Sequence, residues 1–239
     1  MLTIKNLTKK FAEEKEELMV LKDIDFNVKK GEFLTLIGPS GSGKSTLLRI
    51  IGKLEKQTSG ELVWEEEPKI GFVFQNFALF PYMTVSENIG FGLKMADVPE
   101  EIRQKKVKEL IEEIGLKGFE NKHPKELSGG MKQRVGIARA LAIEPNVLLL
   151  DEPFSSLDEF TAEVLRKLLL DLWKARGITV VMVTHLITEA IELSDKIVVI
   201  SSRPGHVIEE TENNLPRPRD LRSDQFFKLV DNLKKLILV

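Results

Sequence analysis

Residues 38–46, GPSGSGKST, have the types and the spacing that phosphate chemistry requires. They fit the pattern G-x-x-x-x-G-K-[ST], with Gly38, Gly43, Lys44 and Ser45 at its fixed positions. The stretch follows the apolar run FLTLI and precedes an apolar helical pattern, which is the strand–loop–helix context of this motif. Its glycines let backbone N–H groups face a phosphate, Lys44 can reach the β- and γ-phosphates, and the Ser45 hydroxyl can hold Mg²⁺. The stretch therefore predicts a nucleotide-binding loop rather than a flexible turn.

Two carboxylates, Asp151 and Glu152, follow the apolar run VLLL. Open α/β sheets bind ligands at the carboxyl ends of their strands, so we expect Asp151 near the phosphate loop, where it would hold Mg²⁺ directly or through water. Glu152 could accept a proton from a water that attacks the γ-phosphate, or orient that water. The alternative is that the pair only begins a solvated loop, an interpretation that a neighbouring phosphate loop disfavours.

Three further residues have two interpretations each. His185 ends the apolar run ITVVMVTH and is either a turn residue before a helix or a hydrogen-bond partner of a γ-phosphate oxygen or of the attacking water. Gln75, after KIGFVF, could supply an oxygen to Mg²⁺ or hold that water. Phe11 is either a core side chain or the flat apolar partner of an adenine ring. Spacing alone leaves these alternatives open.

A second phosphate site is predicted at LSGGMKQRVGIARALA, residues 127–142. A helical pattern begins there directly on Gly129 and Gly130, although adjacent glycines disfavour a helix. A helix opened by Ser128 and these glycines exposes backbone N–H groups and the positive end of its dipole, which suits an anion. A simple helix-start turn is the alternative.

The elements that must position these residues alternate between strands and helices. Continuous apolar runs such as ITVVMV are typical of strands buried on both faces of a parallel sheet. The fold class is therefore α/β, with a mainly parallel sheet and an inserted helical segment. Strands are predicted at residues 2–6, 19–28, 33–37, 70–74, 146–153, 178–185 and 196–200, and helices at residues 99–114, 161–175, 186–194 and 224–239.

The length of 239 residues suits one sizeable domain with a smaller insert. Residues 1–77 and 143–212 are predicted to form the core with an N-terminal β part. Residues 78–142 would then be a helical subdomain, and residues 213–239 a C-terminal helical extension.

Composition limits the classes of partner. The net charge of −2, from 35 basic and 37 acidic residues, gives no overall electrostatic attraction to nucleic acid or to an anionic membrane. The absence of cysteine excludes disulfides and thiolate metal sites and agrees with a reducing compartment. No apolar run reaches the ~18 residues of a membrane span, and the charged N-terminus is unlike a signal peptide. We therefore expect a soluble, cytosolic protein.

Six stretches together resemble the motifs of one family, the ATP-binding subunits of ABC transporters. GPSGSGKST is similar to its Walker A motif, VLLLDE to its Walker B motif, LSGGM to its signature and SSLD at 155–158 to its D-loop. Gln75 is similar to its Q-loop glutamine, and His185 to its switch histidine. The resemblance covers residues 1 to about 210, with the motifs in the family's order.

This resemblance implies a P-loop NTPase core, ATP and Mg²⁺, and hydrolysis of ATP to ADP and phosphate. In the family two subunits pack head to tail, and each ATP lies between the phosphate loop of one subunit and the signature helix of the other. The resemblance implies catalytic roles for Glu152, His185 and Gln75. It also implies metal binding by Ser45, Gln75 and Asp151. It implies nucleotide contacts by Phe11, Gly38, Pro39, Ser40, Gly41, Ser42, Gly43, Lys44, Ser45, Thr46, Ser128, Gly129 and Gly130.

Longer stretches, including LPRPRD and an S-x-R-P-G sequence at 201–205, resemble the nitrate/sulfonate/taurine importer branch, and importers of thiamine precursors look related. The resemblance implies an ATP-dependent homodimer at the cytoplasmic face of the membrane, bound there to a membrane permease, with an extracytoplasmic solute-binding protein as an indirect partner and no nucleic acid. The apolar stretch FQNFALFPYMTVSENI after Val73 would receive the permease. Met131 stands where the family's signature usually has Gln.

Two other classes of protein fit parts of the sequence. A soluble ABC ATPase that acts on DNA or ribosomes would generally carry long coiled coils, zinc modules or two fused cassettes, whereas this chain has one cassette and no cysteine. An ordinary P-loop kinase for a small molecule would leave LSGGMKQR unexplained. The importer subunit is therefore the function that the sequence predicts.

Overall fold

A computed structural model of the protein describes residues 1–12 and 17–237. The chain forms two compact units. The first contains Met1–Pro68 and Thr179–Val239, and the second contains Lys69–Ile178. Among the described residues, we find no helix with the length and apolar character that crossing a membrane requires.

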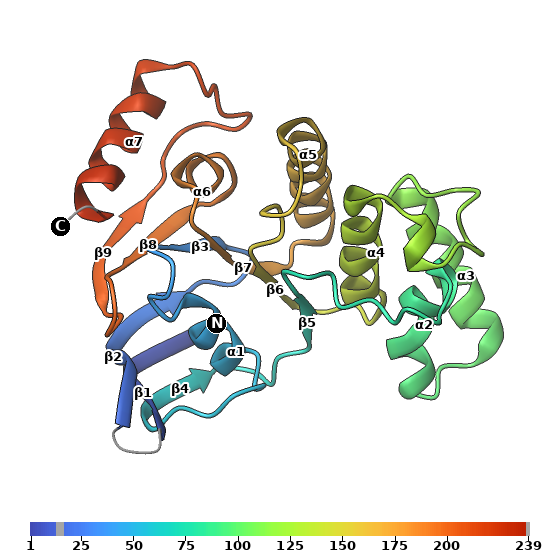
Figure 1. The fold of residues 1–239 in the computed structure, drawn as a ribbon, viewed down its shortest axis with the longest axis horizontal. Helices are drawn as coiled ribbons and strands as arrows, with labels where there is room; N and C mark the ends of the chain where they lie inside the picture. The colour runs from blue at the N-terminus through green and yellow to red at the C-terminus, as the bar shows by residue number, and fades with distance from the viewer. Residues whose placement is uncertain (13–16, 238–239) are drawn as a thin grey trace. The chain divides into compact units, whose positions relative to one another are not determined.

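An antiparallel sheet of three strands belongs to the first unit (Figure 1). Its order is β2-β1-β4, with β1 at Leu2–Ala12, β2 at Glu17–Val28 and β4 at Ser59–Trp64. Along β2, Ile24 and Phe26 are buried while the residue between them is exposed. This period of two is that of a strand with one covered face.

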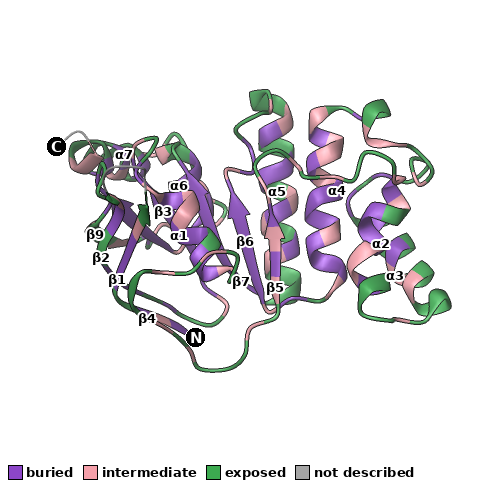
Figure 2. Ribbon diagram, turned by 60° about the horizontal axis from the view of Figure 1, so that its bottom comes forward, coloured by how far each residue is buried: buried purple, intermediate pink, exposed green. Residues whose placement is uncertain are grey.

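Four further strands of the first unit pair in the order β7-β3-β8-β9. The first three are parallel, and every residue in them is buried (Figure 2), as expected for strands covered on both faces. Ile37 of β3 is paired with Thr184 of β7 and with Val199 of β8, so the three strands end at one edge. The bounds are β3 Phe33–Ile37, β7 Thr179–Thr184, β8 Lys196–Ile200 and β9 Val207–Glu212, the last strand being antiparallel to β8.

Three helices pack on these strands: α1 (Lys44–Ile51), α6 (Ile187–Leu193) and α7 (Asp224–Ile237). Figure 1 shows α6 and α7 on one side of the strands and α1 on the other. The C-terminal helix docks on the core through one apolar cluster. The end of the C-terminal helix predicted at 238–239 lies outside the described residues. The buried members of the cluster are Ile37, Ala190, Ile191, Ile197, Val199, Phe226, Val230 and Leu233.

The second unit combines two parallel strands with a helical segment. Strand β5 (Ile70–Val73) pairs with β6 (Val147–Asp151). Thr84 begins the helical segment with a capping box, in which its side chain and that of Glu87 each accept a hydrogen bond from the other's backbone N–H. The helices are α2 (Val85–Met95), α3 (Glu100–Glu113), a short 3₁₀ helix (Pro124–Glu126), α4 (Gly129–Ala142) and α5 (Glu159–Arg176).

The mainly parallel strands, the N-terminal antiparallel sheet and the helical segment confirm the predicted fold class.

Candidate nucleotide-binding site

The phosphate loop leaves β3 at Gly38 and enters α1 at Lys44. Lys44 is only 4% exposed, and its Nζ donates hydrogen bonds to Gly38 O (2.9 Å), Pro39 O (2.7 Å) and Ser42 Oγ (3.3 Å). The loop therefore curls around an ammonium group. A buried ammonium group within such a loop suits a polyphosphate, because its anionic oxygens form strong charge-assisted hydrogen bonds.

The first turn of α1 is open to an anion. Gly43, the N-cap residue, has a φ of 94°, a left-handed conformation that favours glycine, and it makes no side-chain capping bond. No acidic residue lies in the first turn. The first N–H groups and the positive end of the helix dipole can therefore bind phosphate, close to Ser45 and Thr46.

His185 follows the strand that is paired with β3. Because Thr184 and Ile37 are partners in register, His185 and Gly38 leave neighbouring strands at the same edge. The hydroxyl of Thr184 donates to Glu189 Oε2 (2.6 Å) and accepts a hydrogen bond from the Leu186 N–H (3.1 Å), so the turn that carries His185 is held on both sides. The imidazole itself is exposed.

The second unit brings Gln75 and Glu152 together. β5 and β6 are parallel neighbours, and Gln75 Nε2 donates to Glu152 Oε2 (3.2 Å) and to Ser155 Oγ (3.4 Å). Asp151 ends β6 and is 2% exposed. Glu152 has a φ of 44°, a left-handed backbone conformation that is unfavourable for a residue with a Cβ.

Helix α4 begins at Gly129, where the sequence predicts a helix start. Ser128 is the N-cap of α4, and its Oγ accepts from the Met131 N–H (3.3 Å). Gly130 is buried, and a Cβ there would lie 2.4 Å from Cγ2 of Thr161 on α5. Gly130 thus has a packing role within this chain, in addition to the N–H groups that the glycine pair leaves at the helix start.

Phe11 lies in β1 and is 36% exposed, so its interpretation as a core residue is wrong. Lys9 Nζ lies 4.4 Å from the centroid of its ring and also donates to Glu55 Oε1 (2.8 Å). The ring is exposed enough to stack on an adenine, and Lys9 already makes a cation–π contact with it.

Two arginines near these loops were not among the residues that the sequence predicts for the site. Arg203, within the S-x-R-P-G sequence, donates from Nε to Gly41 O (3.2 Å) and so supports the phosphate loop. Arg139 of α4 donates to the carbonyls of Phe77 (3.1 Å) and Ala78 (2.7 Å), which both have positive φ. The S-x-R-P-G sequence could have indicated Arg203, whereas nothing marks Arg139 among the helical residues.

Each unit offers hard oxygen ligands for magnesium: Ser45 in the first, and Asp151 and Gln75 in the second. These donors are few because Mg²⁺ takes its remaining ligands from phosphates and water. Each of the two sets therefore has the donor chemistry that Mg²⁺ on a nucleotide requires.

A phosphate loop after one parallel strand, a carboxylate pair after another and a second helix that opens with glycines define the class, a P-loop ATPase of the ABC type. The ABC transporter family model matches residues 21–155. The chain belongs to this family.

Curated relatives place it near one branch of the family. It is 47% identical over 230 residues to the aliphatic sulfonates import ATP-binding protein SsuB of Bacillus cereus, covering 94% of this chain and 90% of that protein. It is 39% identical over 251 residues to the nitrate import ATP-binding protein NrtD of Synechocystis sp., covering 99% and 94%. The predicted resemblance to the nitrate/sulfonate branch is confirmed.

A solved structure has the same fold. The dimeric post-hydrolysis structure of the ATP-binding cassette MJ0796, with ADP and Pi, matches with a TM-score of 0.80 and 38% identity. The match covers 90% of this chain and 99% of that one.

Proposed function

We propose that this chain is the ATP-hydrolysing subunit of an importer and powers uptake of a small solute through a separate membrane permease. The observation that carries hydrolysis is the contact between Gln75 Nε2 and Glu152 Oε2, 3.2 Å apart. It presents one carboxylate, beside a hydrogen-bonding amide, at the end of a buried strand. Such a pair can orient a water and accept its proton.

The roles of the residues follow from their chemistry. Lys44 exchanges its carbonyl partners for β- and γ-phosphate oxygens, and the N–H groups of residues 41–46 surround the phosphates. Glu152 takes the proton of the attacking water, and His185 donates a hydrogen bond to the γ-phosphate. Mg²⁺, when bound, supplies positive charge to the phosphate oxygens and would be held by Ser45, Asp151 and Gln75.

The helix start at Ser128–Gly130 acts on the nucleotide of a second copy. A γ-phosphate draws in the N–H groups and the positive dipole end of α4. Hydrolysis and release of phosphate remove that charge, and the two copies separate. ATP therefore drives head-to-tail dimerisation.

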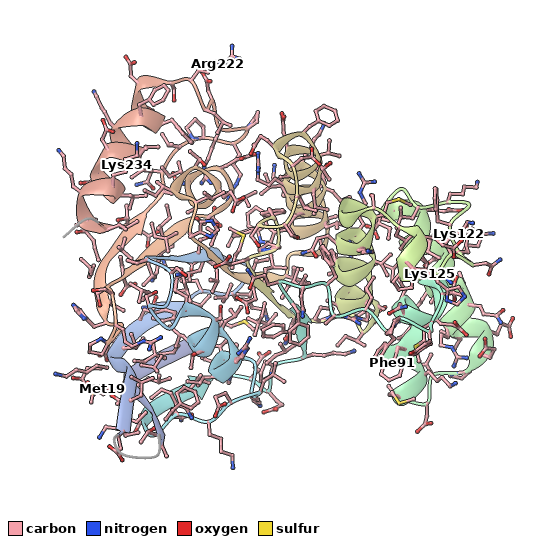
Figure 3. All side chains as sticks on the ribbon, in the orientation of Figure 1. Met19, Phe91, Lys122, Lys125, Arg222 and Lys234 are labelled. Atoms are coloured by element: carbon pink, nitrogen blue, oxygen red, sulfur yellow. The ribbon has the colours of Figure 1, made fainter. Side chains whose placement is uncertain are left out.

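A groove between α2 and α3 supports a permease as the partner. Its volume is about 570 Å³, and its lining includes Met83, Phe91 and Val107 with charged side chains around them. Figure 3 shows Phe91 on this part of the second unit. Tyr82, in the loop before α2, is 92% exposed. Exposed apolar side chains beside such a groove suit a helical segment of a membrane protein, which would hold this chain at the cytoplasmic face.

For the solute, the relatives' names favour sulfonate- or nitrate-like anions over thiamine-precursor-like molecules, with an extracytoplasmic solute-binding protein delivering the anion to the permease. The test is growth of a Bacillus cereus strain that lacks its SsuB, on an aliphatic sulfonate as the only sulfur source. This chain should restore growth and co-purify with the permease, and its Lys44→Ala variant should not restore growth. Co-purification without growth would exclude aliphatic sulfonates as the solute, and absence of both would contradict the importer role.

A further inference from the structure

The C-terminal end of α6 is held by three side chains from the segment between β9 and α7. A helix end leaves its last carbonyl groups without partners inside the helix. Here every carbonyl of residues 191–194 accepts a hydrogen bond from Asn213, Arg217 or Arg219, which we call the clamp. Asn213 Nδ2 donates to two of them at 2.8 and 3.0 Å, Arg219 Nη1 to two at 2.7 and 3.0 Å, and Arg217 Nη2 to one.

The charges of the clamp suit this position. Two guanidinium groups lie at the negative end of the helix dipole, where cations are stabilising. Burial, and secondly the neighbouring Arg217, lower the pKa of Arg219 to about 10, so it remains a cation at neutral pH. The side-chain oxygen of Asn213, a residue only 7% exposed, accepts a hydrogen bond from the Leu215 N–H at 3.3 Å.

Asp195 joins the clamp to the strand that carries the phosphate loop. Its Oδ1 accepts from Arg217 Nη1, and its Oδ2 accepts from the Phe33 N–H at 3.0 Å. The Asp195 N–H donates in turn to Phe33 O at 2.7 Å. Phe33 begins β3, and the phosphate loop leaves the other end of that strand at Gly38.

The opposite end of α6 carries His185. The Thr184–Glu189 hydrogen bond of 2.6 Å ties the residue before His185 to the first turn of the helix. The helix has only seven residues, so a shift at its C-terminal end moves its N-terminal end as well. Helix α7 covers α6 through Phe226 and Val230, next to the clamp in the sequence.

We propose that the clamp is a positioning device, which fixes α6 against β3 and thereby sets the place of His185 beside the phosphate loop. The inference rests on the role of His185 in the proposed function. A displaced His185 leaves the phosphate loop unchanged, so the clamp should affect turnover and spare nucleotide binding. The C-terminal segment is, on this account, part of the hydrolytic machinery through α6.

The test compares Arg219→Lys and Arg217→Lys in the wild-type and His185→Ala backgrounds. Lysine keeps the charge and loses the planar fork that reaches several carbonyls. We expect kcat to fall about tenfold while the Kd of the fluorescent analogue TNP-ATP stays within about twofold. In the His185→Ala background the same substitutions should cause no further loss, because the clamp acts through that side chain. Arg222→Lys, at an exposed arginine of the same segment (Figure 3), is the control and should change nothing.

Thermal unfolding shows whether each variant is folded. If the Arg219→Lys variant is not folded, the Arg217→Lys variant alone tests the proposal. An unchanged kcat in the folded variants would overturn the proposal. So would an equal loss in both backgrounds, or a TNP-ATP Kd that rises in step with the loss of kcat. If His185→Ala alone keeps the full kcat, the role of His185 in the proposed function fails, and the clamp's role fails with it.

Discussion

At the scale of single residues, Lys44 connects the shape of the phosphate loop to its affinity for nucleotide. Its ammonium is buried and donates hydrogen bonds to two carbonyl oxygens and a hydroxyl of the loop. Hydrogen bonds between charged groups are stronger than those to neutral partners. The loop thus holds a cation to which phosphate oxygens would bind more strongly than the loop's own neutral oxygens do.

Replacing Lys44 by Ala should weaken ATP binding. Losing a hydrogen bond to a charged group costs about 1.5–3 kcal/mol, which raises Kd roughly 10- to 150-fold. Titration with TNP-ATP measures the change. Lys53→Ala, which removes an exposed lysine paired with Glu67, is the control and should leave Kd unchanged. A Lys44→Ala protein that binds as tightly as the wild type would show that the loop binds by its backbone alone.

At the scale of helices and strands, α4 explains why two glycines open a helix. Gly130 allows α4 to approach Thr161 of α5, and Thr161 is fixed there because its Oγ1 donates to Asp158 Oδ2 at 2.7 Å. Two requirements are therefore met: Gly130 allows close packing, and both glycines leave backbone N–H groups without bulky side chains at the helix start. The sequence revealed only the second, because the first depends on a neighbour thirty-one residues away.

Gly130→Ala should destabilise the protein through this contact. A Cβ that meets Cγ2 at 2.4 Å must displace a side chain that is already hydrogen-bonded, and such overpacking costs about 1–3 kcal/mol. Urea unfolding measures the loss. In a Thr161→Ser background, which removes Cγ2 and keeps the hydroxyl, the same substitution should cost little. An equal cost in both backgrounds would show that another contact is responsible.

Helix α7 offers a matched pair for testing whether it stabilises the core. Phe226 is 2% exposed and packs on α6 and β8, whereas its neighbour Phe227 is 54% exposed. Phe226→Ala should lower the free energy of unfolding by about 3–5 kcal/mol, and Phe227→Ala should lower it far less. Urea unfolding of the two variants, side by side, makes the comparison. Similar values would show that α7 is not part of the cooperative core.

At the scale of the whole molecule, the buried runs were the easiest part to predict. The strands at 147–151 and 179–184 are buried throughout, because both faces are covered, and the apolar runs VLLL and VVMV mark them in the sequence. Strand β9 was missed, since the charges of VIEETE suit an exposed edge strand as well as a loop. The left-handed backbone of Glu152 was also unpredictable, because tertiary contacts impose it.

The site was predictable as a set of motifs and much less so as a set of contacts. GPSGSGKST identifies a phosphate loop because each position of the motif meets a local need. Nothing local ties Gln75 to Glu152, since the two residues are seventy-seven positions apart, as are register pairs such as Val73 and Leu150 on the strands that precede them. The clamp was equally hidden, although LPRPRD was visible as a motif.

The central claim is that ATP joins two copies of this chain. The most direct measurement is sedimentation velocity of the Glu152→Gln variant, which keeps the shape of the side chain and loses its capacity to take a proton. With ATP and Mg²⁺ this variant should sediment as a dimer, and without nucleotide as a monomer. Substituting Ser128 by Arg should abolish the dimer and leave TNP-ATP binding by the monomer intact. A Glu152→Gln protein that binds ATP and yet remains monomeric at every concentration would contradict the account.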